Sequence, residues 1–285
     1  MSIVVTGATG SLGRLVIEGL LEKVPAEGIT AVVRSEEKAA GFAARGVKIA
    51  VADYNSPETF GSLFSAGDKV LLISGNEFDK GRVSQHKVVL DAAKAAGVGL
   101  FAYTSAPGGL SAALADDHRD TEAAIIGSGV PYVLLRNGWY NENYTERLTP
   151  VLQAGSVTQA AGEGRVASAA RADYAAAAVA VLTGEGHRNA TYELSGDTAW
   201  SFAEYAAELG RQTGAEIGYN AVPVETYTDI LTSHAGLPAP LAAILAGVET
   251  SIEKGELAVT GGDLTRLIGR PTTPIADSIS AALKG

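Results

Sequence analysis

Short runs of apolar, often β-branched residues recur along the first half of the chain. They are predicted strands because each is brief and most end at small polar residues. The runs cover residues 3–5, 30–34, 47–52, 70–73, 100–105 and 130–137. Apolar residues at helical spacing lie between them, over residues 15–21, 83–96 and 117–128. This alternation predicts an α/β fold with a doubly wound parallel Rossmann sheet and right-handed crossovers.

Beyond residue 150 the pattern changes to short helical segments separated by glycine and proline. The predicted elements are a helix over 172–182, a strand over 192–195, and helices over 202–213, 224–235, 240–253, 262–268 and 275–283. We expect a sheet domain over residues 1–154, which residues 165–197 rejoin. Residues 198–285 are then a small, mostly helical domain that covers the carboxyl ends of the strands.

A glycine-rich turn joins the first predicted strand to the first predicted helix. It reads Gly7, Ala8, Thr9, Gly10, Ser11, Leu12 and Gly13, a GxxGxxG spacing. Gly7 allows a tight turn, Gly10 lets backbone approach a pyrophosphate, and Gly13 lets the helix lie close to the strand. Amides at the helix N-terminus favour the phosphate charge. Strand, glycine turn and helix in this order indicate a dinucleotide site, and the alternative is a plain turn.

The residues at the end of the second predicted strand indicate whether the site prefers NAD or NADP. An acidic residue there bonds the ribose 2′-hydroxyl of NAD, whereas an arginine accommodates the 2′-phosphate of NADP. Here the position carries Arg34, and Lys38 lies one helical turn further on. A guanidinium fork matches a phosphate well. NADPH is therefore favoured over NADH, and the alternative is a solvated arginine at a strand end.

Small polar residues follow the other predicted strands. They are Asp53 after the third, Ser74, Gly75 and Asn76 after the fourth, and Thr104 and Ser105 at the end of the fifth. Ligands of open parallel sheets bind beyond the carboxyl ends of the strands. We therefore expect these residues beside the cofactor. Asp53 contacts the adenine edge in this interpretation, or only caps a turn.

Composition excludes several other functions. The 285 residues contain no cysteine and only four histidines, without an HxH or HExxH pair, so we expect no metal site. A net charge of −10 argues against nucleic acid as a partner. No apolar run approaches the roughly 20 residues of a membrane helix. The chain enters its first strand without a signal-like region, so we expect a cytoplasmic protein.

The chain resembles the NmrA-like branch of the atypical short-chain dehydrogenase/reductase superfamily. Within that branch it is most similar to the bacterial reductases of quinones and triphenylmethane dyes. The matching stretches run almost from end to end, at residues 5–13, 31–34, 72–74, 102–105, 134–140 and 267–269. The resemblance implies NADPH on residues 7–12, Arg34, residues 74–76 and the segment Asn137, Gly138, Trp139, Tyr140, Asn141 and Glu142. It also implies that a quinone or similar planar ring accepts hydride directly, without flavin.

The chain departs from its relatives at the proton donor. Typical short-chain dehydrogenases use a Tyr-x-x-x-Lys pair, which this chain lacks after Ser105. Isoflavone-reductase relatives place a lysine on the helix before a Pro-Tyr strand, and here His118 takes that position. A reduced quinone is an anion of low basicity, so orientation and a hydrogen bond matter more than a strong acid. His118 is the candidate acid, or it forms a surface ion pair with Glu122. His86 is interpreted as a surface or capping residue.

Three residues after the sixth predicted strand form the other candidate group. If the chain turns helically after Gly138, then Tyr140, Asn143 and Tyr144 share one face. Asn143 is the candidate donor to the quinone oxygen, and Tyr140 or Trp139 stacks on the ring. In the alternative interpretation the aromatic residues are core and the asparagines are caps.

Three functions remain open from the sequence. The first is an NADPH-dependent quinone reductase that transfers hydride to a small aromatic substrate. The second is a redox sensor that binds NADP without turnover, as the missing Tyr/Lys pair suggests. The third is a reductase of aromatic secondary metabolites or triarylmethane dyes. A homodimer is left open, and neither nucleic acid nor membrane is an expected partner.

Overall fold

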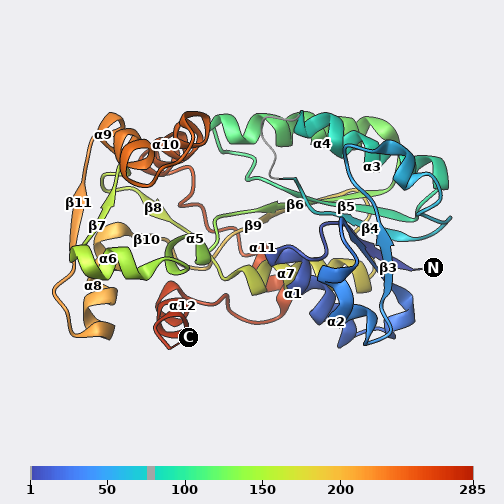
Figure 1. Ribbon diagram of the computed structural model, residues 1–285, viewed down its shortest axis with the longest axis horizontal. Coiled ribbons are helices and arrows are strands. Elements are labelled where there is room, and N and C mark those ends of the chain that lie inside the picture. Colours follow the sequence, from blue (N-terminus) through green and yellow to red (C-terminus); the bar gives the residue numbers. More distant parts are fainter. Residues whose placement is uncertain (1, 76–80, 285) are drawn as a thin grey trace.

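The computed structural model describes residues 2–75 and 81–284. A parallel sheet runs through the larger part of the molecule (Figure 1), with the strand order β3-β2-β1-β4-β5-β6-β9. Its strands are β1 Ile3–Val5, β2 Ile29–Val33, β3 Lys48–Val51, β4 Lys69–Leu72, β5 Leu100–Ser105, β6 Tyr132–Asn137 and β9 Ala190–Leu194. The predicted doubly wound Rossmann sheet is confirmed, because every neighbouring pair is parallel.

Helices cover both faces of this sheet because successive strand residues point to opposite sides. Val5 faces helices α1 (Ser11–Leu21) and α7 (Arg171–Thr183), whereas Val4 faces α3 (Arg82–Ala96) and α4 (Asp116–Ser128). Figure 1 shows α3 and α4 on one side of the sheet and α1, α2 (Ala40–Ala43) and α7 on the other. Burial on both faces explains why the strands are almost wholly apolar.

Smaller elements complete this part of the chain. They are the 3₁₀ turns Ala26–Gly28, Glu37–Ala39, Pro57–Phe60 and Ala113–Ala115.

The order of the strands reverses between β1 and β4. Strands β2 and β3 lie on one side of β1, whereas β4, β5, β6 and β9 lie on its other side. Ligands of open α/β sheets bind at such a switch point.

A smaller lobe lies at the far end of the molecule from the N-terminus (Figure 1) and has its own core around Trp200, Phe202 and Ile252. Its helices are α5 Glu142–Thr145, α6 Leu148–Ala154, α8 Phe202–Thr213, α9 Val224–Asp229, α10 Ala239–Glu253 and α12 Ile275–Ala282, and a π-helical turn spans Ile230–His234. Four short strands form two small sheets: β7 Ser156–Gln159 with β11 Gly218–Ala221, and β8 Arg165–Val166 with β10 Trp200–Ser201. The sequence did not predict these strands.

The division between the two parts also differs from the expected one. Leu148 and Val157 pack in the core of the smaller lobe, so the chain leaves the sheet domain before residue 154. Helix α11 (Asp263–Ile268), expected in the covering domain, instead packs against α7 and β9 through Leu264. The return of α7 and β9 to the sheet agrees with the prediction.

Within residues 2–75 and 81–284, no helix has the length and apolar character needed to cross a bilayer.

Candidate functional site

The turn after β1 is tight because its three glycines lack side chains. Gly7 has a φ of 60°, a left-handed conformation that glycine adopts without strain. The Gly10 amide donates to the Gly7 carbonyl at 2.9 Å, and α1 begins at the next residue. A Cβ on Gly13 would lie 2.3 Å from the Gly7 carbonyl oxygen and 2.8 Å from Ala8 Cα. The glycine spacing therefore lets α1 start directly beneath the turn.

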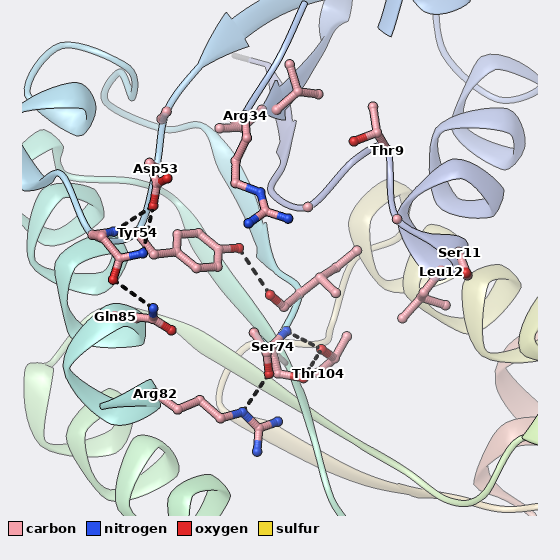
Figure 2. Close-up of a pocket in the computed structure, with 18 of the residues that line it drawn as sticks. Thr9, Ser11, Leu12, Arg34, Asp53, Tyr54, Ser74, Arg82, Gln85 and Thr104 are labelled. Atoms are coloured by element: carbon pink, nitrogen blue, oxygen red, sulfur yellow. Dashed lines mark hydrogen bonds between the residues drawn. The ribbon is translucent and has the colours of Figure 1, made fainter. Parts of the chain in front are cut away.

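A cavity of about 670 Å³ lies at the switch point, between the carboxyl ends of β1 and β4 (Figure 2). Its lining comes from the turn after β1, the ends of β2 to β5, helix α3 and the segment after β6. The lining residues are Gly7, Thr9, Gly10, Ser11, Leu12, Val32, Val33, Arg34, Ala52, Asp53, Tyr54, Asn55, Ile73, Ser74, Gly75, Arg82, Gln85, Thr104, Tyr140, Asn143 and Arg171. Its volume suits a sizeable organic ligand.

One end of the cavity carries Arg34 and the residues after β3. Figure 2 shows the Arg34 side chain projecting into the space between Tyr54 and Thr9. Asp53 lines the cavity and also accepts hydrogen bonds from the Asn55 backbone and side chain, as expected of a turn cap, and its contact with an adenine edge stays a prediction. Lys38, expected beside Arg34, is exposed on a 3₁₀ turn and is not among the lining residues.

Tyr54 is a cavity residue that sequence reasoning missed. Its hydroxyl lies 2.6 Å from Thr6 Oγ1 and 3.1 Å from the Ile73 carbonyl, and donates to them. Burial raises the pKa of Tyr54 to about 12. The neutral tyrosine thus ties the end of β3 to the ends of β1 and β4.

The strand ends contribute unequally to the cavity. Ser74, Gly75 and Thr104 line it, and the Ser74 amide donates to Thr104 Oγ1 at 2.9 Å. Ser105 is turned away, because its hydroxyl donates to the Glu122 carboxylate at 2.6 Å. Asn76 lies outside the described residues. The lining set thus contains fewer of these small polar residues than the sequence predicts.

Two residues of the segment after β6 reach the cavity. Tyr140 and Asn143 line it, and the Arg171 guanidinium lies 5.3 Å from the centre of the Tyr140 ring. The Asn137 amide donates to the Tyr140 hydroxyl at 3.3 Å. Tyr144 does not share their face, contrary to the expectation. Its ring packs in the smaller core against Trp200.

The other residues of that segment hold it in place and do not line the cavity. Gly138 donates its amide to the Leu194 carbonyl on β9, and Trp139 packs against the smaller core. The Asn141 side chain bonds to the Thr273 carbonyl and to two serine hydroxyls, at Ser168 and Ser278. Both oxygens of Glu142 accept from the Arg171 amide at 2.9 Å. These residues are therefore positioned to support Tyr140 and Asn143, a structural role close to the capping alternative.

His118 does not have the geometry expected of a proton donor. It is buried behind Arg82, whose Nη2 donates to His118 Nε2 at 2.8 Å. The only proton of the neutral ring is then on Nδ1, which faces the Tyr103 hydroxyl at 2.8 Å and not the cavity. Burial, together with the Arg82 charge, lowers the pKa of His118 to about 2. His118 is thus a neutral hydrogen-bond acceptor at neutral pH.

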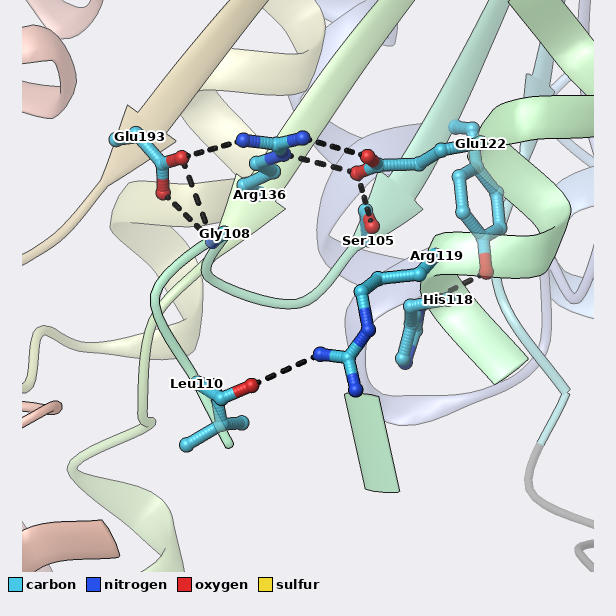
Figure 3. Close-up of polar contacts among 9 residues, drawn as sticks. Ser105, Gly108, Leu110, His118, Arg119, Glu122, Arg136 and Glu193 are labelled. Carbon is cyan, nitrogen blue, oxygen red and sulfur yellow. Dashed lines mark hydrogen bonds and ion pairs between the residues drawn. The ribbon is translucent and has the colours of Figure 1, made fainter. Parts of the chain in front are cut away.

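Glu122, the suggested ion-pair partner of His118, belongs to a different network (Figure 3). Arg136 on β6 forms two hydrogen bonds to Glu122, at 3.0 and 2.6 Å, and a third to Glu193 at 2.8 Å. Glu193 also accepts from the Gly108 amide. Both carboxylates raise the pKa of the Arg136 guanidinium. The network anchors the loop after β5. Among the described residues, this network contains no Tyr/Lys pair.

A family model described as NAD(P)H-binding matches residues 7–185, which include the turn after β1 and all of the residues given above as lining the cavity. The chain belongs to this NAD(P)H-binding family. The match confirms a nicotinamide dinucleotide as the ligand of this family, and the glycine turn as its binding residues stays a prediction.

Relatives of this NAD(P)H-binding protein are enzymes. Quinone oxidoreductase 2 of Escherichia coli (strain K12) is 44% identical over 284 residues, which cover 98% of this chain and 97% of the relative. A crystal structure of NADPH-dependent quinone oxidoreductase from E. coli, complexed with NADPH, matches with a TM-score of 0.95 over 99% of both chains. Triphenylmethane reductase of Citrobacter sp. matches with a TM-score of 0.93 at 40% identity, over the full length of both chains. The resemblance to quinone and dye reductases is confirmed.

The NAD(P)H-binding chain also buries a carboxylic acid in its smaller lobe, at Glu249. Glu249 on α10 accepts from the Ala160 amide at 2.9 Å, and burial raises its pKa to about 7. Because the unfolded carboxyl titrates near its ordinary value of 4.5, the folded protein binds the extra proton between pH 4.5 and 7. This residue therefore costs stability as pH rises through that window.

We expect Glu249→Gln to stabilise the protein at pH 8 and to have little effect at pH 5. The amide keeps an acceptor for Ala160 and carries no charge, so the cost of burying a carboxylate disappears. The gain at pH 8 is about 3 kcal/mol, because the pKa shift from 4.5 to about 7 is worth roughly 1.4 kcal/mol for each unit. Urea unfolding of both proteins at the two pH values measures it. Equal differences in unfolding free energy at pH 5 and pH 8 would show that Glu249 is not protonated on folding.

Proposed function

We propose that the protein is an NADPH-dependent reductase that transfers hydride directly to a quinone or similar planar aromatic, without flavin. The observation that carries the proposal is one cavity with two unlike ends. The glycine turn and Arg34 line one part, and Tyr140 and Asn143 line another. The quinone and dye reductase relatives support the same reaction class.

The residues present fit NADPH. The first amides of α1 lack intrahelical partners by geometry, Gly7 and Gly10 present no side chain to a pyrophosphate there, and Gly13 lets α1 lie against the turn. Arg34 projects into the cavity where a 2′-phosphate needs a cation. Thr104, Tyr140 and Asn143 then remain for the nicotinamide end. When bound there, NADPH supplies the hydride.

The chain's own residues orient the acceptor and do not supply a strong acid. The exposed Asn143 side chain donates a hydrogen bond to a quinone oxygen, and the Tyr140 ring provides an apolar wall. Reduction of a quinone produces a weakly basic oxyanion that hydrogen bonds stabilise. Since the His118 ring is neutral and presents no proton to the cavity, solvent protonates the product.

Quinone-dependent oxidation of NADPH tests the proposed function. The purified protein is mixed with NADPH alone, with NADPH and p-benzoquinone, and with NADPH and a triphenylmethane dye. We expect rapid loss of nicotinamide absorbance only when an acceptor is present. Tight NADPH binding without turnover of any acceptor would refute the reductase and favour the sensor. Turnover of the dye but not of the quinone would indicate that the protein is a reductase of triphenylmethane dyes and not of quinones.

Asn143→Ala is expected to lower kcat about 10-fold while the Kd for NADPH changes less than about twofold. The reason is that Asn143 is proposed to contact the acceptor and not the nucleotide. Steady-state assays with p-benzoquinone and a fluorescence titration of NADPH measure the two quantities. Asn220→Ala, an exposed asparagine on β11, is the control for general damage. An unchanged kcat would remove Asn143 from the mechanism.

A further inference from the structure

Gly75 lines the cavity, and both its backbone amide and its backbone carbonyl are hydrogen-bonded to side chains. Its amide donates to His86 Nε2 at 3.0 Å, and its carbonyl accepts from Arg82 Nε at 2.7 Å. Figure 2 shows the contact from Arg82 beside Ser74. Arg82 and His86 lie one turn apart on α3, so one rigid helix supplies both partners. We call this arrangement the Gly75 clamp.

Hydrogen bonds fix the protonation of the clamp's histidine. A backbone amide only donates, so His86 Nε2 is the acceptor and the ring proton is on Nδ1. Nδ1 lies 3.0 Å from Thr121 Oγ1, and the Thr121 hydroxyl donates to the Asp117 carbonyl at 2.7 Å. His86 is buried, contrary to the surface role expected from the sequence. Burial and the Arg82 charge lower the pKa of His86 to about 3, so it stays an acceptor at neutral pH.

The arginine of the clamp is fixed by α4. Arg82 Nη2 donates to His118 Nε2 at 2.8 Å, and His118 Nδ1 faces the Tyr103 hydroxyl at 2.8 Å (the bond in Figure 3). The guanidinium is therefore oriented by a histidine on the neighbouring helix while its Nε reaches Gly75. Both histidines act only when neutral, because protonation would replace an acceptor with a donor.

We propose that His86 and His118 are positioning residues that hold the Gly75 wall against the hydride-donating end of the bound cofactor. The inference rests on the proposed function. Ser74 and Thr104, which are joined by a hydrogen bond, lie on the same wall as Gly75. The clamp orients the wall that carries Ser74 and Thr104 and adds little to affinity, because it contains neither the glycine turn nor Arg34. Small displacements of a reacting pair reduce rate steeply.

Paired substitutions separate positioning from mere support of the fold. His86→Leu removes the acceptor, whereas His86→Gln keeps one, and His118→Leu and His118→Gln form a second pair. We expect each leucine variant to lower kcat about 10-fold with a Kd for NADPH within about threefold of wild type. The glutamine variants should recover most of kcat. Val89→Ala, in the core on the same helix, is the control that destabilises the fold without touching Gly75.

Hydrogen exchange of the segment 73–75 provides a readout that does not need turnover. Exchange of the Gly75 amide should quicken in His86→Leu and stay slow in His86→Gln and Val89→Ala. If wild type does not reduce a quinone, the proposed function fails, and this exchange pattern still decides the clamp. Leucine and glutamine variants with the same kcat, or Gly75 exchange that is unchanged in His86→Leu, would overturn the inference.

Discussion

Replacing Gly13 by alanine is expected to weaken NADPH binding about 100-fold and to destabilise the fold by about 2 kcal/mol. The added Cβ would lie 2.3 Å from the Gly7 carbonyl oxygen and 2.8 Å from Ala8 Cα, and both are backbone atoms. Helix α1 has to move away from the turn to relieve the overlap. The α1 amides that are proposed to bind the diphosphate then leave their positions. Fluorescence titration of NADPH and urea unfolding measure the two effects.

The matched control is Gly127→Ala. Gly127 is exposed within α4, and a Cβ there meets no atom within 4 Å. Alanine is the better helix former, so this variant should be as stable as wild type or more stable by about 0.5–1 kcal/mol. NADPH affinity should not change. Wild-type affinity in Gly13→Ala would contradict the geometry given for the glycine turn.

Arg34→Glu is expected to raise the Kd for NADPH about 100-fold and the Kd for NADH less than threefold, since a charged pair of hydrogen bonds is worth about 3 kcal/mol. The 2′-phosphate is the only group that distinguishes the two nucleotides. A guanidinium that projects into the cavity attracts it, and a carboxylate at the same place repels it. The ratio of the two dissociation constants therefore isolates this contact.

Lys48→Glu is the control for the change of net charge. Lys48 is exposed at the amino end of β3, opposite the strand end that lines the cavity. Lys48→Glu should weaken the binding of NADPH and of NADH slightly and equally, through long-range charge alone. Equal losses of NADPH and NADH in Arg34→Glu would mean that the 2′-phosphate lies elsewhere.

The sheet could be predicted from the sequence because parallel strands covered on both faces are nearly continuous apolar runs. The ends of the strands β1 to β6 fall within about two residues of the predicted ends. Strand order then brings the polar residues after β1 to β5 to one edge. Thus Arg34, Asp53, Ser74 and Thr104 were found together, and they do line one cavity.

The histidines could not be placed because their partners lie far away in the sequence. His86 bonds Thr121, and His118 bonds Arg82, which are separated by 35 and 36 residues. Helical spacing tells which residues share a face, but the first turns of α3 and α4 bury polar residues against one another. The apolar residues that indicate burial, such as Val89 and Ile125, come later in each helix. The expectation of an exposed His86 and of a proton-donating His118 failed for this reason.

The smaller lobe was incompletely predicted because its strands are too short to show a period of two. β7 and β11 have four residues each, and β8 and β10 have two. Their pairing depends on contacts such as Tyr219 with Val157, across about sixty residues of chain. Tyr54 was missed for a related reason. Nothing local to it predicts that its hydroxyl reaches Thr6 and Ile73.

The central claim is that this cavity holds NADPH and delivers its hydride to a quinone. A single-turnover experiment tests it: the protein saturated with NADPH is mixed with p-benzoquinone, and nicotinamide absorbance is followed in time. The account predicts a rapid fall that is slowed when the transferred hydrogen of NADPH is deuterium, and a much smaller fall for Gly13→Ala at the NADPH concentration that saturates wild type. Absorbance that declines no faster than in the protein-free mixture, while NADPH remains bound, would contradict it.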